Sequence, residues 1–330
     1  MEPILTASEL IDIAFNAASN VMAPRNNVPV VWVKKKEIER IKIVESTITS
    51  KLDRIINVTP WIHELHPFYV ELVALLVGID DLKKSLAAVK WAAQKIRSLA
   101  TVYIQKISRS RTINEAGTNR KVAYGRIASV LKQVSDALVF LRDAFVRLRK
   151  LPSVDPTLMT LVVAGYANVG KSTFVGCLST AKPEVAAYPF TTRGIVVGHR
   201  VLPEGTCQIV DTPGLLDRPL SKRNKIELQA IGAMKHLADL IFFIVDPSES
   251  CGYDLGSQIN LLNEISSLFP NIPMIRIVNK VDVATQAQIE SATHGICGDA
   301  VQVSALTNQG VATAFQKALD LASARRSIQT

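Results

Sequence analysis

The chain has 330 residues, of which 48% are hydrophobic and 20% are charged. This length exceeds one average domain, and this balance favours two folded domains over a disordered chain. No apolar run approaches the roughly 18 residues of a membrane helix, and Glu2 and Glu9 stand where an export signal carries Lys or Arg. The four cysteines form no CxxC pair, which argues against a zinc site or a disulfide framework and favours a reducing cytoplasm.

The net charge of +9 is concentrated in the first half of the chain. Residues 1–150 contain 24 basic and 14 acidic residues, or +10, whereas residues 151–330 contain 14 and 15, or −1. The excess is largest from Lys83 to Lys150, where 16 basic residues accompany three acidic ones. The sequence therefore predicts a basic first module and a nearly neutral second one.

Residues 1–150 have helical periodicity. Segments near 6–20, 34–57 and 66–77 are predicted helices, punctuated by Pro60 and Pro67. Two longer runs repeat apolar residues at alternating spacings of four and three, which is typical of packed helices: Leu82, Leu86, Val89, Ala93, Ile96, Ala100, Tyr103, Ile107, and then Ile127, Leu131, Val134, Leu138, Leu141, Phe145, Leu148. A polar, basic segment over 108–121, with turn formers Gly117 and Asn119, is expected to join two antiparallel helices. We predict an all-α bundle.

The proline-containing segment 151–156 (LPSVDP) is the predicted linker between the modules. Beyond it, short β-rich runs alternate with helical stretches over 157–330, as in a mostly parallel, doubly wound sheet. Two successive strands meet at Pro203–Glu204–Gly205, where we expect a hairpin. The predicted architecture is an α-helical bundle followed by an α/β domain.

A phosphate-binding loop follows the first of these strands. Residues Gly165–Ser172 (GYANVGKS) match GxxxxGK[ST], in which backbone N–H groups and a helix dipole hold phosphates. Lys171 is expected to neutralise phosphate oxygens and Ser172 to ligate Mg²⁺. The expected nucleotide-binding residues of this loop are Asn168, Val169, Gly170, Lys171, Ser172 and Thr173.

Three further motifs follow in order. In the Asp211–Gly214 motif (DTPG), Asp211 ends a strand and can hold Mg²⁺ through water, and the Gly214 N–H can approach a γ-phosphate. In Asn279–Asp282 (NKVD), the Asp282 carboxylate can accept two hydrogen bonds from guanine, which disfavours ATP. The Ser304–Ala305–Leu306 segment can offer a backbone amide to the guanine carbonyl. We therefore predict GTP and GDP as ligands, held in part by Asn279, Lys280, Asp282, Ser304, Ala305 and Leu306.

The four ordered motifs resemble the P-loop GTPases of the Obg-like branch, so the second module is expected to be a P-loop GTPase domain. Between the P-loop and DTPG, the segment Tyr188–Thr192 (YPFTT) offers threonine hydroxyls for Mg²⁺, and spacing does not choose between Thr191 and Thr192. The resemblance gives that role to the second, Thr192. The sequence is also similar to the Nog group of ribosome-assembly GTPases, in the segments LHPFYVEL, LRKLPSVDP, VGHR, LSKRNKIELQAI and ESCGYDLGSQI.

The Nog resemblance implies GTP binding and hydrolysis during maturation of the large ribosomal subunit, and this chain resembles a minimal archaeal-type form. Lys171, Thr192 and Gly214 are the expected catalytic residues. Leu215 stands where Ras-like GTPases carry the glutamine that orients water, which predicts slow intrinsic hydrolysis. Asn168 stands where potassium-activated GTPases carry an asparagine, so K⁺ is a candidate second ion.

The basic module has two interpretations. An exposed basic helix face is usually only solvated, but three acidic residues against 16 basic ones favour a phosphate-rich partner. Aromatic residues are few, so we expect backbone contacts to rRNA or a pre-ribosome, centred on Arg109, Arg111, Arg120 and Lys121, and no DNA or membrane partner. We expect a cytoplasmic monomer. The alternatives are a regulatory GTPase that acts in translation or stress through a protein partner, without RNA contact, and a module in which GTP is structural.

Overall fold

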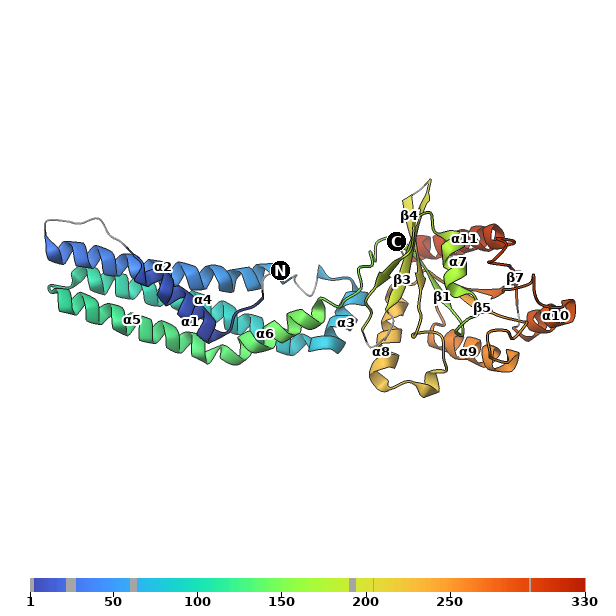
Figure 1. Cartoon of the computed structure of the whole chain (residues 1–330), viewed down its shortest axis with the longest axis horizontal. Coiled ribbons are helices and arrows are strands. Elements are labelled where there is room, and N and C mark those ends of the chain that lie inside the picture. Colours follow the sequence, from blue (N-terminus) through green and yellow to red (C-terminus); the bar gives the residue numbers. More distant parts are fainter. Residues whose placement is uncertain are drawn as a thin grey trace. The chain divides into compact units, whose positions relative to one another are not determined.

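The chain forms two compact units, shown in Figure 1. The computed structural model describes residues 3–21, 28–59, 64–189, 194–203, 205–296 and 298–329. The helical unit contains residues 1–64 and 76–149, and the α/β unit contains residues 65–75 and 150–330. The sequence-based division placed residues 65–75 in the bundle, whereas the structure groups them with the α/β unit.

The helical unit confirms most of the predicted helices, but the second long run, predicted over 127–148, is divided at Val134 between two helices. Its elements are α1 (Ala7–Ser19), α2 (Pro29–Val58), α4 (Ile79–Arg109), α5 (Ile113–Gln133) and α6 (Ser135–Leu148). Helices α2, α4 and α5 pack on one another, α1 lies against α2 and α5, and α6 lies against α4. The alternating apolar seam of α4 is buried, as its spacing predicts, with Val89, Ile96 and Ile107 all fully inaccessible to solvent.

The polar segment 108–121, predicted to be a connection between two helices, is mostly helical, so this prediction is wrong. The turn between α4 and α5 occupies only Ser110–Thr112. Thr112 caps α5 by accepting a hydrogen bond from the Glu115 N–H at 3.1 Å, and Glu115 accepts one from the Arg111 N–H at 2.7 Å. This capping outweighs the turn preference of Gly117, so Arg120 lies inside a helix and pairs with Glu37 at 2.5 Å.

The α/β unit confirms the mostly parallel, doubly wound sheet. The strand order is β2-β3-β4-β1-β5-β6-β7, with the β2/β3 and β3/β4 pairs antiparallel and the others parallel. The strands are β1 (Met159–Ala164), β2 (Glu184–Ala186), β3 (Ile195–Leu202), β4 (Gly205–Asp211), β5 (Leu240–Val245), β6 (Met274–Val278) and β7 (Ala300–Gln302). The β3–β4 register pairs Leu202 with Gly205, as the expected hairpin requires, although Glu204 itself lies outside the described residues.

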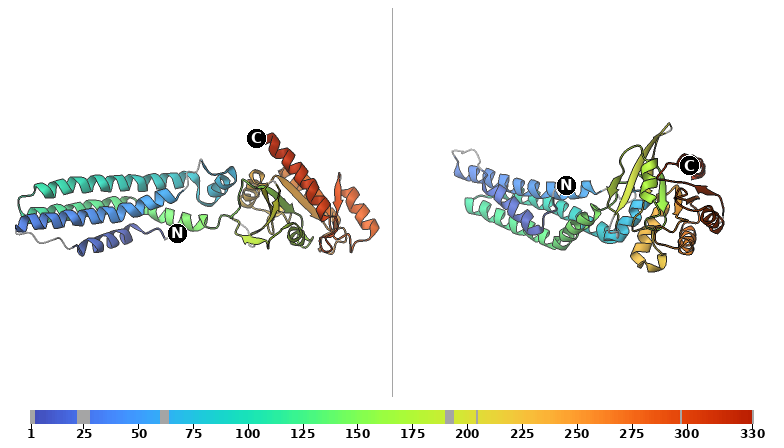
Figure 2. Two further views of the ribbon diagram at one scale, coloured as in Figure 1. Left: turned by 90° about the horizontal axis from the view of Figure 1, so that it is seen from above. Right: turned by 45° about the vertical axis from the view of Figure 1, so that its right-hand side comes forward.

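Helices cover both faces of this sheet (Figures 1 and 2). They are α7 (Lys171–Leu178), α8 (Lys225–Ala233), α9 (Leu255–Leu268), α10 (Gln286–Gly295) and α11 (Val311–Gln329), with short 3-10 turns η2 (Leu220–Lys222) and η3 (Met234–His236). Helices α7 and α11 contact each other on one side, and α8 and α9 lie on the other. Parallel strands end at one edge of the sheet, which brings the loops that carry the motifs together.

Helix α3 (Pro67–Val77) joins the α/β core through its first turns. Phe68 and Leu72 are fully buried in the same apolar cluster as the sheet. The Tyr69 hydroxyl reaches the carbonyls of Pro152 at 2.9 Å and Val154 at 2.5 Å. This packing explains why residues 65–75 group with the α/β unit although they precede α4 in the chain.

Helix α11 closes the opposite edge of the sheet, where β1 and β5 begin. Arg325 donates to the Ala238 carbonyl at 2.5 Å. Arg326 donates to the Thr157 carbonyl at 3.0 Å and pairs with Asp239 at 2.8 Å. Asp239 in turn accepts a hydrogen bond from the Thr160 N–H at 2.8 Å, so the last helix satisfies the polar groups at this edge.

Candidate nucleotide-binding site

The loop between β1 and α7 has the strained backbone that its glycines predict. Gly165, Asn168 and Gly170 have φ values of 130°, 64° and 101°. A Cβ at Gly165 would lie 2.4 Å from the Ile244 carbonyl oxygen, so only glycine fits there. Asn168 is exposed and is one of the few non-glycine residues that tolerate this conformation. The loop thus curls tightly at the start of α7.

Lys171 folds back across this loop. Its Nζ donates to the carbonyls of Gly165 at 2.9 Å and Tyr166 at 2.7 Å, and the side chain is almost completely buried. Burial lowers the pKa of Lys171, and Asp211 opposes that shift. The Lys171 ammonium is therefore held against the loop. A phosphate bound there would supply the hydrogen-bond acceptors that the ammonium loses when it is buried.

Ser172 and Asp211 meet where the sequence predicts a metal site. The Ser172 hydroxyl donates to Asp211 Oδ2 at 2.6 Å, and the other oxygen, Asp211 Oδ1, is buried without a hydrogen-bond partner. Burial raises the pKa of Asp211, and the bond from Ser172 and the charge of Lys171 offset part of that shift. A hydroxyl beside a carboxylate with an unsatisfied oxygen suits Mg²⁺, which prefers oxygen ligands. These residues fit the ion that the motif implies.

Asn279 serves as a brace between two loops. Its Nδ2 donates to the Val169 carbonyl at 2.8 Å, and its Oδ1 accepts from the Ala305 N–H at 3.0 Å. A Cβ at Gly170 would lie 2.3 Å from Asn279 Nδ2. The sequence placed Asn279 in the base site, and the structure brings its side chain against the phosphate loop and the Ser304–Leu306 segment.

The other base-site residues surround this brace. The Asp282 carboxylate is exposed, as a group that accepts hydrogen bonds from a ligand must be. Ser304 is buried, and its hydroxyl accepts from the Thr307 N–H at 3.2 Å, which shapes the loop whose Ala305 N–H is bonded to Asn279. Leu306 is 80% exposed. The motifs predicted over 279–306 thus lie together at one edge of the sheet.

Asp246 is a polar centre that the sequence analysis missed. It follows β5 and accepts hydrogen bonds from Lys280 Nζ at 2.7 Å, Ser250 Oγ at 3.0 Å and the Cys251 N–H at 2.9 Å. Burial alone would raise the pKa of Asp246, but Lys280 and the serine hydroxyls outweigh it and hold the pKa below its usual value. The available signal was an Asp at the end of a buried strand, the same position that Asp211 has on β4.

The Gly214 N–H is engaged inside the protein. It donates to Asp217 Oδ2 at 2.7 Å, and Arg223 donates to the Gly214 carbonyl at 2.5 Å and to Asp217 Oδ1 at 3.4 Å. Arg223 also donates to the Leu215 carbonyl, and the Leu215 side chain is buried. Neither Asp217 nor Arg223 belonged to the predicted site.

The segment before Thr192 is anchored by an aromatic residue. The buried Tyr188 hydroxyl donates to the Ala230 carbonyl of α8 at 2.7 Å, and the Tyr188 ring lies 6.3 Å from that of Phe68. Burial raises the pKa of Tyr188 far above its usual value. Thr192, expected to act on Mg²⁺ and in catalysis, lies outside the described residues.

Comparisons with known proteins match both units. The family model of the NOG1 N-terminal helical domain matches residues 1–155, and that of nucleolar GTP-binding protein 1 (NOG1) matches residues 225–282. An uncharacterized Methanocaldococcus jannaschii protein is 43% identical over 88% of this chain and 82% of its own length. Nucleolar GTP-binding protein 1 of Eremothecium gossypii is 32% identical over 84% of this chain, which spans only 44% of that relative.

A solved structure is also similar in sequence. The crystal structure of nucleolar GTP-binding protein 1 from Plasmodium falciparum is 34% identical, with coverage of 54% of this chain and 93% of that one and a TM-score of 0.47. Within the residues that the structure describes, no helix has the length and apolarity needed to cross a membrane.

Proposed function

Because the chain belongs to the nucleolar GTP-binding protein 1 family, we propose that its α/β unit binds GTP and GDP and hydrolyses GTP as a molecular switch. The observation that carries the proposal is the juxtaposition of Ser172 with Asp211, whose buried Oδ1 has no partner, beside Lys171. Since the chain spans less than half of its fungal relatives, the proposal rests on the residues present here.

Guanine selectivity is assigned to Asp282. Its exposed carboxylate can accept hydrogen bonds from the two N–H donors on one edge of guanine, and adenine does not offer these donors there. We expect Asp282→Asn to shift preference from guanine to xanthine nucleotides, because the amide can donate to the oxygen that xanthine carries instead. Competition binding with labelled GDP measures this shift. A variant that keeps its preference for GTP would contradict the assigned base site, and Asp299→Asn is the matched exposed control.

Phosphate and metal binding are assigned to the loop residues. Ser172 and Asp211, the latter through water, would hold Mg²⁺, which neutralises phosphate charge when bound. Lys171 already lies at the loop mouth and would exchange its carbonyl contacts for phosphate oxygens. Asn168, Val169, Gly170 and Thr173 complete the cradle, and Thr192 is proposed as the second hydroxyl on the metal.

Slow intrinsic hydrolysis is expected because Leu215 offers no polar group to a water molecule. The exposed, positive-φ Asn168 supports stimulation by K⁺, since its carboxamide oxygen is available beside the phosphate loop. Turnover in KCl and NaCl at matched ionic strength tests this. Equal rates in the two salts would exclude the K⁺ role of Asn168 and leave the nucleotide assignment intact.

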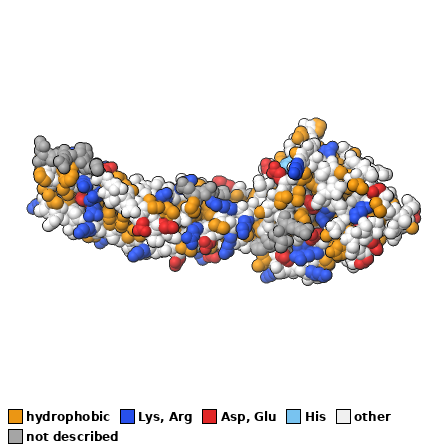
Figure 3. Space-filling view, in the orientation of Figure 1, with side chains coloured by type: hydrophobic (Ala, Val, Ile, Leu, Met, Phe, Trp, Pro, Cys, Tyr) orange, Lys and Arg blue, Asp and Glu red, His pale blue; other side chains and the backbone are white. Residues whose placement is uncertain are grey.

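The helical unit is proposed to contact rRNA in a precursor of the large ribosomal subunit. Figure 3 shows Lys and Arg side chains along the visible face of this unit, interspersed with fewer acidic ones. Arg109, Arg111 and Lys121 lie close to the α4–α5 turn and are exposed, whereas Arg120 is committed to Glu37 and to the Tyr124 ring. We therefore propose that Arg109, Arg111 and Lys121 contact the RNA.

Co-sedimentation with large ribosomal subunits and their precursors tests this role. Binding of the chain loaded with a non-hydrolysable GTP analogue should exceed that of the GDP form and should weaken across a salt series. Association in neither state would favour the alternative, a regulatory GTPase that acts through a protein partner. Association that ignores the nucleotide would favour a structural role for GTP.

A further inference from the structure

A buried ion pair joins the base motif to the loop between β5 and α9. Lys280 Nζ lies 2.7 Å from Asp246 Oδ2, and the Asp246 side chain is fully inaccessible to solvent. Ser250 bridges the pair, because its Oγ accepts from Lys280 Nζ at 2.9 Å and donates to Asp246 Oδ2 at 3.0 Å. A buried carboxylate is costly unless it is paired and hydrogen-bonded, so these contacts fix the end of the Lys280 side chain.

Asp246 is itself held in place by the loop that it begins. Gln258 of α9 accepts from the Asp246 N–H at 2.8 Å, donates to the Asp246 carbonyl at 3.0 Å and donates to the Tyr253 carbonyl at 3.0 Å. The Tyr253 ring stacks on Tyr166 of the phosphate loop, with 4.2 Å between the ring centroids. The loop is therefore attached both to α9 and to the phosphate loop, which leaves Asp246 little freedom to move.

The backbone of Lys280 determines where Asp282 lies. Lys280 has a φ of 62°, a left-handed conformation that is costly for a non-glycine residue and persists where the surrounding contacts enforce it. Its carbonyl accepts from the N–H groups of Val283 at 3.0 Å and Ala284 at 3.1 Å, which closes a turn around Asp282. A displacement of Lys280 would therefore displace the carboxylate that is assigned to guanine.

We propose that Asp246 is a positioning residue for guanine recognition, which fixes Lys280 and, through the turn that follows, the carboxylate of Asp282. This inference rests on the proposed function of Asp282 as the acceptor for guanine. Because Asp246 is fully buried, it acts through Lys280 and not by contact with the base. Two hydrogen bonds from one base edge need both carboxylate oxygens at the correct distance and angle, so their strength depends on how accurately the turn is held.

The test compares GDP with inosine diphosphate, whose base lacks the exocyclic amine and offers Asp282 one N–H donor instead of two. Competition of each nucleotide with fluorescent GDP on the full chain gives the ratio of the two affinities. We expect Asp246→Asn to lower this ratio about threefold to tenfold, because the neutral amide loses its ion pair with Lys280. A role of Asp246 in stability alone would weaken both nucleotides equally and leave the ratio unchanged.

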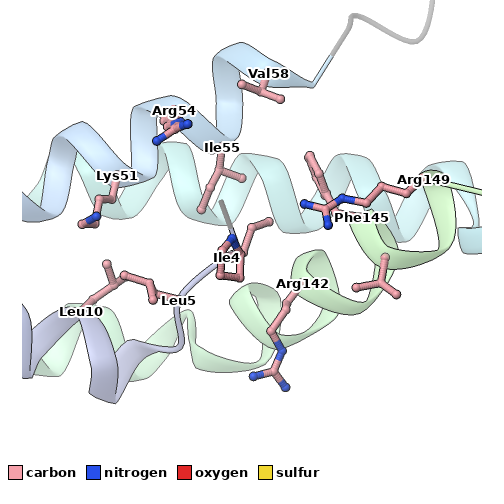
Figure 4. Close-up of a pocket in the computed structure, with 12 residues that line it drawn as sticks. Ile4, Leu5, Leu10, Lys51, Arg54, Ile55, Val58, Arg142, Phe145 and Arg149 are labelled. Carbon is pink, nitrogen blue, oxygen red and sulfur yellow. The ribbon is translucent and has the colours of Figure 1, made fainter. Parts of the chain in front are cut away.

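Two control variants separate positioning from stability. Asp254→Ala removes a carboxylate of the same loop, which caps α9 by accepting from the Ser257 N–H at 2.8 Å. Ile55→Val trims a buried residue of the helical unit, where Ile55 lines a cavity between α1, α2 and α6 (Figure 4). Both variants should lower the urea midpoint and keep the wild-type ratio of affinities.

Lys280→Met and the double variant Asp246→Asn/Lys280→Met complete a double-mutant cycle. Since the two side chains act as one unit, their effects on the ratio should not add. The double variant also removes both charges together, so it remains a test if a single variant leaves an unpaired buried charge and unfolds.

Two results would overturn the proposal, and they are distinct. A wild-type ratio in Asp246→Asn, or in the double variant if the single one unfolds, would exclude the positioning role and leave guanine binding in place. Equal affinity of the wild type for GDP and inosine diphosphate would instead refute the assignment of Asp282, on which the inference depends.

Discussion

The backbone N–H of Gly214 donates a hydrogen bond to the carboxylate of Asp217 at 2.7 Å. Gly214 is the residue expected to approach a γ-phosphate, and its N–H has one hydrogen to offer. Arg223 donates to the same carboxylate and to the Gly214 carbonyl, so both polar groups of the Gly214 backbone are bonded within the protein. In this conformation Asp217 occupies the N–H that the proposed contact with a third phosphate would use.

Removal of this competing acceptor should favour triphosphate. We expect Asp217→Ala to raise the affinity for a non-hydrolysable GTP analogue relative to GDP by about fivefold to thirtyfold, the equivalent of about 1–2 kcal/mol for one hydrogen bond. Binding of fluorescent nucleotides by equilibrium titration measures the ratio. Asp299→Ala removes an exposed carboxylate from the same unit as a control. An unchanged ratio would show that Gly214 does not contact the third phosphate.

The Asn279 brace predicts coupled losses of stability and binding. Replacement by Ala leaves the Val169 carbonyl and the Ala305 N–H without their partner, and a buried polar group left unsatisfied costs about 1–3 kcal/mol. We expect Asn279→Ala to lower the free energy of unfolding by about that amount and to weaken GDP binding. Urea denaturation and nucleotide titration measure the two effects. Exposed Asn271→Ala should change neither quantity, and similar behaviour of both variants would refute the brace.

His66 predicts a loss of stability in mild acid. Its Nδ1 accepts a hydrogen bond from the Phe68 N–H at 3.4 Å, and protonation would convert that acceptor into a donor. Burial lowers the pKa of His66 below 6.5, and His236 adds to the shift. The unfolded chain therefore binds the proton more readily, so stability present above pH 6.5 is lost as the pH falls through the folded-state pKa.

The measurement is the urea midpoint at pH 7.5 and pH 5.5. We expect the urea midpoint of the wild type to be lower at pH 5.5 than at pH 7.5. The decrease should be smaller for His66→Asn, because Asn keeps an acceptor at the start of α3 without titrating. His294→Asn changes an exposed histidine on α10 and should retain the wild-type pH dependence. An equal decrease of the urea midpoint in all three proteins would exclude His66 as the titrating group.

The proposed RNA contact predicts a specific change in salt dependence. The triple variant Arg109→Gln, Arg111→Gln and Lys121→Gln removes three exposed charges near the α4–α5 turn. If each contacts one phosphate, the slope of log affinity against log salt should fall by up to about three. Filter binding to rRNA fragments measures it. The control Lys83→Gln with Lys84→Gln changes exposed residues at the start of α4, and an equal effect there would indicate non-specific attraction.

Short-range patterns predicted much of the site. The phosphate loop, Asp211 and the base motif lie at the ends of parallel strands, and that topology alone brings Ser172 to Asp211. Contacts between residues chosen by tertiary packing were not predictable from spacing. Arg120 meets Glu37 across two helices, and Arg326 meets Asp239 from the far end of the α/β unit. Helix α3 was assigned to the bundle by its sequence position, while the burial of Phe68 places it in the other core.

The contacts that Arg325 and Arg326 of α11 make at the start of β1 and β5 have a consequence for how the protein folds during synthesis. Arg326 donates to Thr157 across 169 positions of the chain, and it neutralises Asp239, which is nearly buried. During synthesis from the N-terminus, β1 and β5 emerge well before α11 does. Until α11 leaves the exit tunnel, Asp239 lacks its guanidinium partner, and the carbonyls of Thr157 and Leu158 just before β1 lack their donor. The α/β unit is therefore a domain whose folding finishes only after its last helix has been translated.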